Sequence, residues 1–113
     1  MNYTDPYSRR PRPVPTGDAT VEGVIRACFW RKSEWHPPGK FKIEVRSDEG
    51  WICEGSLPRH IVADLELETT NSKPARARNR SKTVGRRIRL DATFKPREGD
   101  SAYFDWPKNA RLL

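Results

Sequence analysis

A strictly alternating segment in the middle of the chain sets the strongest limit on its fold. In KFKIEVRS, residues 40–47, apolar and polar side chains take turns, which is typical of a half-exposed β-strand. The turn sequence DEG and a second β-rich segment, WICEGSL, follow directly. A three-residue turn with Gly50 in the left-handed conformation predicts a hairpin that pairs Val45 with Cys53 and Ile43 with Gly55.

Three further segments, residues 19–30, 86–95 and 101–106, also have strand patterns. The only good helix candidate is LPRHIVADLE, residues 57–66, whose apolar residues make one short face. Strand parity predicts the inward-facing side chains, which are Val21, Gly23, Ile25, Ala27, Phe29, Phe41, Ile43, Val45, Trp51, Cys53, Gly55, Leu57, Ile88, Leu90, Ala92, Phe94, Ala102, Phe104 and Trp106.

The order of these elements predicts one mainly β domain. Three strands, one short helix and two more strands is the order of a five-stranded OB-fold-like barrel, with the helix between strands 3 and 4. The domain is expected over residues 18–113, with a basic loop over residues 69–83. Residues 1–17 contain four prolines and three arginines without periodicity, so we expect a disordered Pro/Arg-rich arm there.

The positive charge of the chain is concentrated in one stretch. The chain has 113 residues and a net charge of +7. Of its 22 lysines and arginines, eight lie between Lys73 and Arg89, where no acid occurs, and the remaining 14 nearly balance the 15 acidic residues. Such a stretch attracts nucleic acid or other anionic surfaces, and a purely solvated loop is the alternative.

Two parts of the sequence carry a family resemblance. FKIEVRSDEGWICEGSLPRHIVADLE and VGRRIRLDATFKPREGDSAYFDWPKNARLL resemble small OB-like domains of actinobacteria and their phages. The matching features are the turn at 48–51, the GSLP segment at 55–58, the strand at 84–94 and the aromatic strand at 103–106. The resemblance implies binding of single-stranded nucleic acid, or less often of oligosaccharides or proteins, and a role in phage or plasmid replication.

Binding of single strands needs aromatic faces for the bases and cations for the backbone. The stacking candidates are Trp30, Trp35 and Tyr103, although Trp30 could instead cap the end of the barrel. The cations expected near the first three strands are Arg26, Arg31, Lys32, Lys40, Lys42 and Arg46. The cations expected on a flexible basic loop are Arg76, Arg78, Arg80 and Lys82.

Other classes of function find little support in the sequence. Cys28, Cys53 and the two histidines do not have zinc-site spacing, and neither a phosphate-binding loop nor a nucleophile motif occurs. We therefore expect a non-enzymatic cytoplasmic protein with reduced thiols, no metal, no cofactor and no membrane partner. Its expected partner is single-stranded DNA or RNA, and the alternative is an acidic protein that docks on the basic loop.

Overall fold

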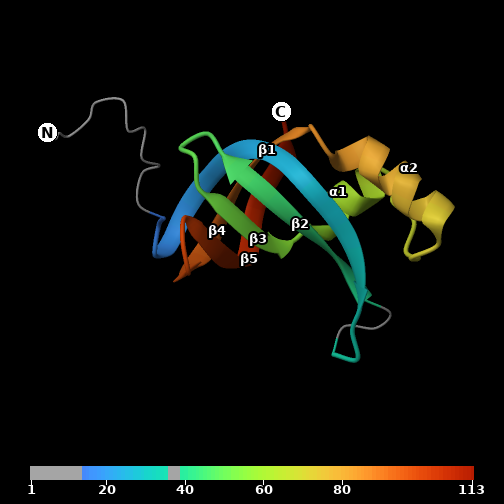
Figure 1. Ribbon diagram of the computed structural model, residues 1–113, viewed down its shortest axis with the longest axis horizontal. Helices are drawn as coiled ribbons and strands as arrows, with labels where there is room; N and C mark the ends of the chain where they lie inside the picture. The colour runs from blue at the N-terminus through green and yellow to red at the C-terminus, as the bar shows by residue number, and fades with distance from the viewer. Residues whose placement is uncertain (1–13, 36–38) are drawn as a thin grey trace, which may run out of the picture.

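The computed structural model describes residues 14–35 and 39–113, so the predicted arm lies outside the described residues up to residue 13. Five strands form a closed barrel in the order β1-β2-β3-β5-β4 (Figure 1). Strands β3 and β5 are parallel, and the other neighbours are antiparallel. This arrangement confirms the predicted OB-fold-like barrel. The strands are β1 (Gly17–Lys32), β2 (Gly39–Ser47), β3 (Ile52–Ser56), β4 (Arg87–Arg97) and β5 (Ser101–Leu112).

The predicted hairpin between β2 and β3 is confirmed in its register. Val45 pairs with Cys53, and Ile43 pairs with Gly55. Gly50 has a φ of 100°, a conformation that glycine adopts without steric cost. Because side chains alternate along each strand, this register buries the predicted residues of β3 and the adjoining Trp51 in the barrel.

Strand β1 contains a bulge that reverses the predicted side-chain parity of its second half. Its first half pairs with β4 and its second half with β2, and the register with β2 shifts between Ile25 and Ala27. A bulge bends a strand and adds an unpaired residue, which lets one strand serve both neighbours. The prediction that Ala27 and Phe29 face inward is therefore wrong, and Trp30 faces the core instead.

Strand β5 departs from simple alternation at Trp106, which was predicted to face the core. Its register with β4 moves from the pair Thr93–Asp105 to the pair Asp91–Lys108, so β5 carries one extra residue between them. Trp106 adopts a left-handed φ of 56° and keeps 76% of its surface exposed. The prediction of a buried Trp106 is wrong because parity holds only while both strands advance residue by residue.

Two helices connect β3 to β4, whereas one was predicted. Helix α1 (Arg59–Asp64) corresponds to the predicted helix, and α2 (Lys73–Thr83) replaces most of the predicted basic loop. Ser72 caps α2 by accepting a hydrogen bond from the backbone amide of Ala75 (3.3 Å). The buried residues Ala75, Asn79 and Thr83 recur every four positions, so they form the face of α2 that packs on the protein.

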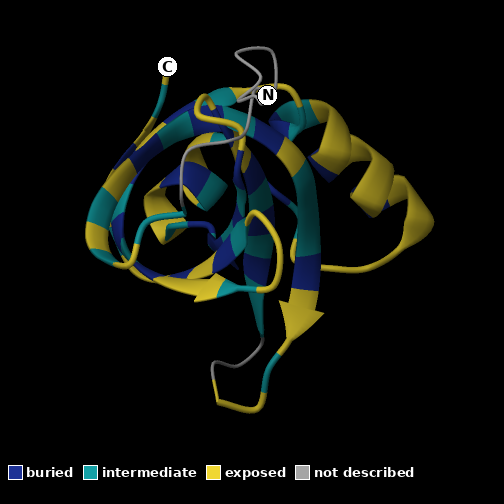
Figure 2. Cartoon of the chain, turned by 60° about the vertical axis from the view of Figure 1, so that its left-hand side comes forward, coloured by how far each residue is buried: buried dark blue, intermediate teal, exposed yellow. Residues whose placement is uncertain are grey.

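Helix α2 is fixed to the preceding segment and to β1. The side chain of Asn79 donates to the carbonyl of Glu68 and accepts from its amide, both at 2.9 Å. After the helix, the amide of Gly85 donates to the carbonyl of Ile25 (2.8 Å). Both helices lie at the end of the barrel where β2 begins (Figure 1), and the outer surface of α2 is exposed (Figure 2). The basic segment is therefore a docked helix.

Candidate nucleic-acid interface

The bulge in β1 places an aromatic side chain among cations on the outer surface of the barrel. Phe29 lies opposite Lys42 of β2, and Arg31 lies opposite Lys40. The guanidinium carbon of Arg31 lies 5.0 Å from the centre of the Phe29 ring, within the range of a cation–π contact. One aromatic ring and three cations therefore share a small area of the β1–β2 surface.

A second arginine–aromatic pair lies further around the barrel, on β4 and β5. The guanidinium carbon of Arg97 lies 4.3 Å from the centre of the Tyr103 ring. Tyr103 is 49% exposed and lies beside Glu54 of β3, and Glu54 is itself 3.9 Å from the Arg97 guanidinium. We call the six residues of the two pairs and the lysines between them the cation–aromatic strip; they are Phe29, Arg31, Lys40, Lys42, Arg97 and Tyr103.

Lys42 is the cation of the strip whose pKa responds to burial and to several neighbouring charges. Partial burial is the main cause that lowers its pKa, and the charges of Lys40 and Arg31 lower it further. The carboxylates of Glu54 and Asp105 act in the opposite direction. An anion bound beside Lys42 would stabilise its charged form, because opposite charges favour ionisation.

The acidic residues on this surface have cationic partners. Glu44 forms an ion pair with Arg26 at 2.9 Å, and Asp105 forms one with Lys95 at 3.1 Å. Glu54 lies near Arg97, as described above. These pairings reduce the repulsion that the acids would exert on a polyanion. Arg26, which was predicted to contact the nucleic-acid backbone, therefore already has an ion-pair partner in Glu44.

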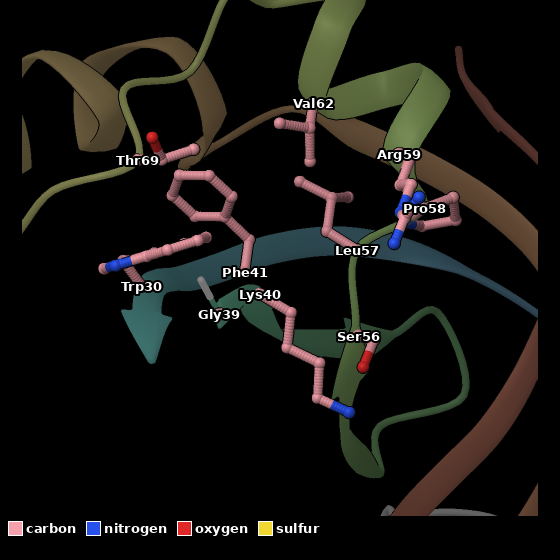
Figure 3. Close-up of a pocket in the computed structure, with 10 residues that line it drawn as sticks. All are labelled: Trp30, Gly39, Lys40, Phe41, Ser56, Leu57, Pro58, Arg59, Val62 and Thr69. Carbon is pink, nitrogen blue, oxygen red and sulfur yellow. The ribbon is translucent and has the colours of Figure 1, made fainter. Parts of the chain in front are cut away.

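An apolar groove of about 540 Å³ adjoins the strip at the end of the barrel. Phe41, Leu57 and Val62 point into it, while Lys40 extends the other way, beside Ser56 (Figure 3). Trp30 forms one wall, packed against Phe41 with ring centres 5.0 Å apart. A groove with apolar walls and a few polar groups at its rim suits a flat aromatic ligand.

The structure divides the predicted cations of α2 into two sets. Arg78 is paired with Glu68 through two hydrogen bonds of 2.6 and 2.7 Å, and Lys82 donates to the Glu66 carbonyl (3.0 Å). Arg76 and Arg80 are exposed and have no ion pair with any residue that the structure describes. Two of the four cations are therefore committed to holding the helix in place.

The remaining predicted site residues lie in different places. Trp35 is 89% exposed in the connection from β1 to β2, and Lys32 is exposed at the end of β1. Trp30 is only 8% exposed, so it lines the groove and cannot offer a free face. Arg46 is exposed on β2 but lies opposite Val24, on the far side of the bulge from Phe29.

Sequence reasoning missed Phe29 and Arg97 as parts of the site. Phe29 was placed inside because the bulge in β1 was not foreseen. Arg97 lies between the predicted strand segments 86–95 and 101–106, and nothing in its neighbourhood in the sequence points to Tyr103. The unbroken run of β-type residues over 19–30 was the available signal, since a strand this long must bend in a small barrel.

The described residues contain neither a metal-binding cluster nor an activated thiol. No group of three or more histidine, cysteine or acidic residues among them is arranged to hold a metal ion. Burial raises the pKa of Cys53 to about 12 and also raises that of Cys28, so both thiols stay protonated and weakly nucleophilic. No helix of the described chain is long and apolar enough to cross a bilayer.

Comparison with known proteins does not assign a function to the chain, so its function is argued from the chemistry of these surfaces. No protein-family model matches the chain, and no curated protein matches it. The most distinctive surface is the cation–aromatic strip with its adjoining groove, because it joins flat rings, guanidinium planes and lysines on one exposed sheet face.

Proposed function

We propose that this protein binds single-stranded nucleic acid without catalysing a reaction, with the strand lying across the cation–aromatic strip. The observation that carries the proposal is the pair of arginine–aromatic contacts on either side of Lys42. Stacking of a base on such a platform contributes roughly 1–3 kcal/mol, and lysines supply contacts to the backbone. OB-type barrels commonly use this part of the sheet for oligonucleotides.

The two arginines extend the surface on which bases can stack. Arg31 covers one face of Phe29, and Arg97 covers one face of Tyr103. Guanidinium groups are planar, so a base can stack on the arginine, which then lies between the base and the ring. Bases in a duplex have both faces covered by their neighbours, and the strip therefore favours a single strand.

The groove beside Lys40 gives the strand a second kind of contact. A base that leaves the stack can enter between Phe41, Leu57 and Val62. Its phosphate then lies outside the groove, on the side of Ser56, where Lys40 supplies positive charge. One inserted base fixes the position of the strand, while the open strip tolerates different sequences.

Fluorescence polarisation with a labelled oligothymidine of about 20 nucleotides tests the proposal. Binding should weaken as salt rises, and each lost phosphate contact should reduce the slope of log K against log salt by about 0.7. Lys42→Gln should reduce the slope by that amount. Tyr103→Ala should weaken binding about tenfold or more without changing the slope.

Arg46→Gln is the matched control, because Arg46 lies on the same strand as Lys42 but outside the strip. It should change affinity by about twofold at most, since its charge is screened from the strand by salt. Absence of binding at low salt would contradict the proposal. So would a duplex competitor that displaces the oligothymidine as well as an unlabelled single strand does.

An acidic protein is the second candidate partner, and the exposed face of α2 favours it. Lys73, Arg76 and Arg80 lie three and four positions apart, so they share one side of the helix. A labelled polyglutamate peptide is the probe for this alternative. Binding that is lost on Arg76→Gln/Arg80→Gln and retained on Lys42→Gln would support it.

A further inference from the structure

A second surface depression lies beside the irregular part of β5. It has a volume of about 350 Å³ and is lined by Asp18, Ala19, Thr20, Asp91, Ala92, Thr93, Trp106 and Lys108. It uses the first half of β1, before the bulge, whereas the cation–aromatic strip uses the second half. Trp106 is an exposed large aromatic residue within this depression.

Two residues of β5 have left-handed backbone conformations there. Trp106 has a φ of 56° and Asn109 a φ of 53°. Asparagine adopts this region fairly readily, but a bulky residue such as tryptophan rarely does. Such conformations persist only where the surrounding structure imposes them, and they concentrate at functional sites. Their effect here is to turn the indole of Trp106 outward and to bring Asn109 beside Asp91.

Asp91 is held in place by two neighbours. The amide nitrogen of Asn109 donates to its Oδ2 at 2.8 Å, and the Thr20 hydroxyl donates to its Oδ1 at 2.5 Å. These two hydrogen bonds lower the pKa of Asp91, so the carboxylate is ionised at neutral pH. A rigid anionic group thus lies beside an exposed indole.

Asp18 adds a second carboxylate to the depression. The Thr93 hydroxyl donates to its Oδ1 at 2.7 Å, which leaves the other oxygen free of protein hydrogen bonds in the described chain. Neither Asp18 nor Asp91 lies within 4.0 Å of a cation among the residues that the structure describes. The two carboxylates are therefore available to a cationic group supplied by a partner.

We propose that this depression binds an arginine side chain from a peptide segment of a partner protein. A guanidinium group stacks on an indole face and also donates in-plane hydrogen bonds to a carboxylate, so it satisfies both features at once. The charge of the two aspartates complements a basic peptide and repels a nucleic-acid phosphate. The binding is independent of the proposed function of the cation–aromatic strip.

Lys108 sets a limit on the affinity. It lies opposite Asp91 across the β4–β5 pairing and lines the depression. Its ammonium group repels an incoming guanidinium, because like charges in one small site raise the free energy of the complex. Removal of this charge should therefore tighten peptide binding, which distinguishes the depression from acidic surfaces elsewhere.

Fluorescence polarisation with a labelled peptide that carries two arginines in a glycine–serine background tests the assignment. The full chain should bind it, and a peptide with citrulline in place of both arginines should bind at least about tenfold more weakly. Trp106→Ala and Asp91→Asn should each weaken binding about tenfold. Lys108→Ala should strengthen it.

Trp35→Ala is the matched control, because Trp35 is also a highly exposed tryptophan but lies in the connection from β1 to β2. It should leave peptide affinity unchanged, and circular dichroism should show that every variant keeps the wild-type fold. Equal binding of the arginine and citrulline peptides overturns the proposal, as does a Trp106→Ala variant with wild-type affinity. Displacement by free arginine at the peptide's own concentration would overturn the assignment to a peptide.

Discussion

Replacement of Gly23 by alanine is expected to disrupt the point at which the barrel closes. Gly23 pairs with Ser47 of β2 on one side and with Ile88 of β4 on the other. An added Cβ would lie 2.1 Å from the carbonyl oxygen of Arg46 and 2.8 Å from the Cα of Ser47. Both obstacles are backbone atoms, so no change of rotamer can relieve the overlap.

The size of the effect follows from that geometry. Forcing an extra carbon into a packed interior typically costs 1–3 kcal/mol, so rigid backbone contact puts Gly23→Ala at about 3 kcal/mol or more. For a domain of this size each kcal/mol lowers Tm by roughly 4–8 °C, so the expected drop is roughly 12–24 °C. Thermal denaturation followed by circular dichroism measures it, and urea denaturation gives the free energy of unfolding.

Two other glycines provide the comparison. Gly99 has a φ of 72° with nothing within 4 Å of an added Cβ, so Gly99→Ala carries only conformational strain of about 1–2 kcal/mol. In Gly55→Ala the nearest obstacle, at 2.5 Å, is the buried ring of Phe104, which is a side chain rather than backbone and can give way only at a cost in core packing. Gly99→Ala should therefore be the most stable of the three variants, Gly55→Ala intermediate and Gly23→Ala the least stable. A Gly23→Ala variant that melts near Gly99→Ala would refute the reasoning.

Three further predictions concern stability and reactivity. Asn79→Ala should lower the free energy of unfolding by about 2 kcal/mol, measured in urea, because it removes both hydrogen bonds to the Glu68 backbone. Hydrogen bonds from Arg87 lower the pKa of Asp48 in the folded protein below its ordinary value of 3.8. Their contribution to stability is therefore fully present above pH 3.8 and is lost as pH falls through the folded-state pKa. The difference in Tm between wild type and Arg87→Gln should accordingly shrink in acid. Cys53, with a pKa of about 12, should react with a disulfide reagent at pH 8 far more slowly in the native than in the urea-unfolded protein, and equal rates would contradict its burial.

The parts of the fold that follow local rules could be predicted from the sequence. Alternation and the Gly50 turn together define the β2–β3 register, because a slip by one residue would expose the entire core face. The bulge at Ile25–Ala27 and the left-handed Trp106 could not be predicted in this way. They arise where a strand must serve two neighbours, which depends on closure of the whole barrel.

Helix α2 was missed for a different reason. Its buried positions hold Ala75, Asn79 and Thr83, so the apolar periodicity that indicates a helix is absent. The small Ala75 and the hydrogen bonds of Asn79 replace the large apolar contacts of an ordinary amphipathic helix.

Some residues of the candidate site could be predicted from their neighbours in the sequence, whereas others join the site only through the tertiary fold. Arg31, Lys40, Lys42 and Tyr103 were identified from charge and strand parity, which need only the neighbouring residues. Phe29 and Arg97 join them through the bulge in β1 and the β4–β5 pairing, which bring together residues distant in sequence.

The position of β5 in the barrel has a consequence for synthesis on the ribosome. β5 is the last of the five strands to emerge, yet it hydrogen-bonds to both β3 and β4. Until it does so, each of these strands presents an unpaired edge that another chain can join. The interval between translation of β4 and docking of β5 is therefore the period in which the nascent protein is most exposed to aggregation.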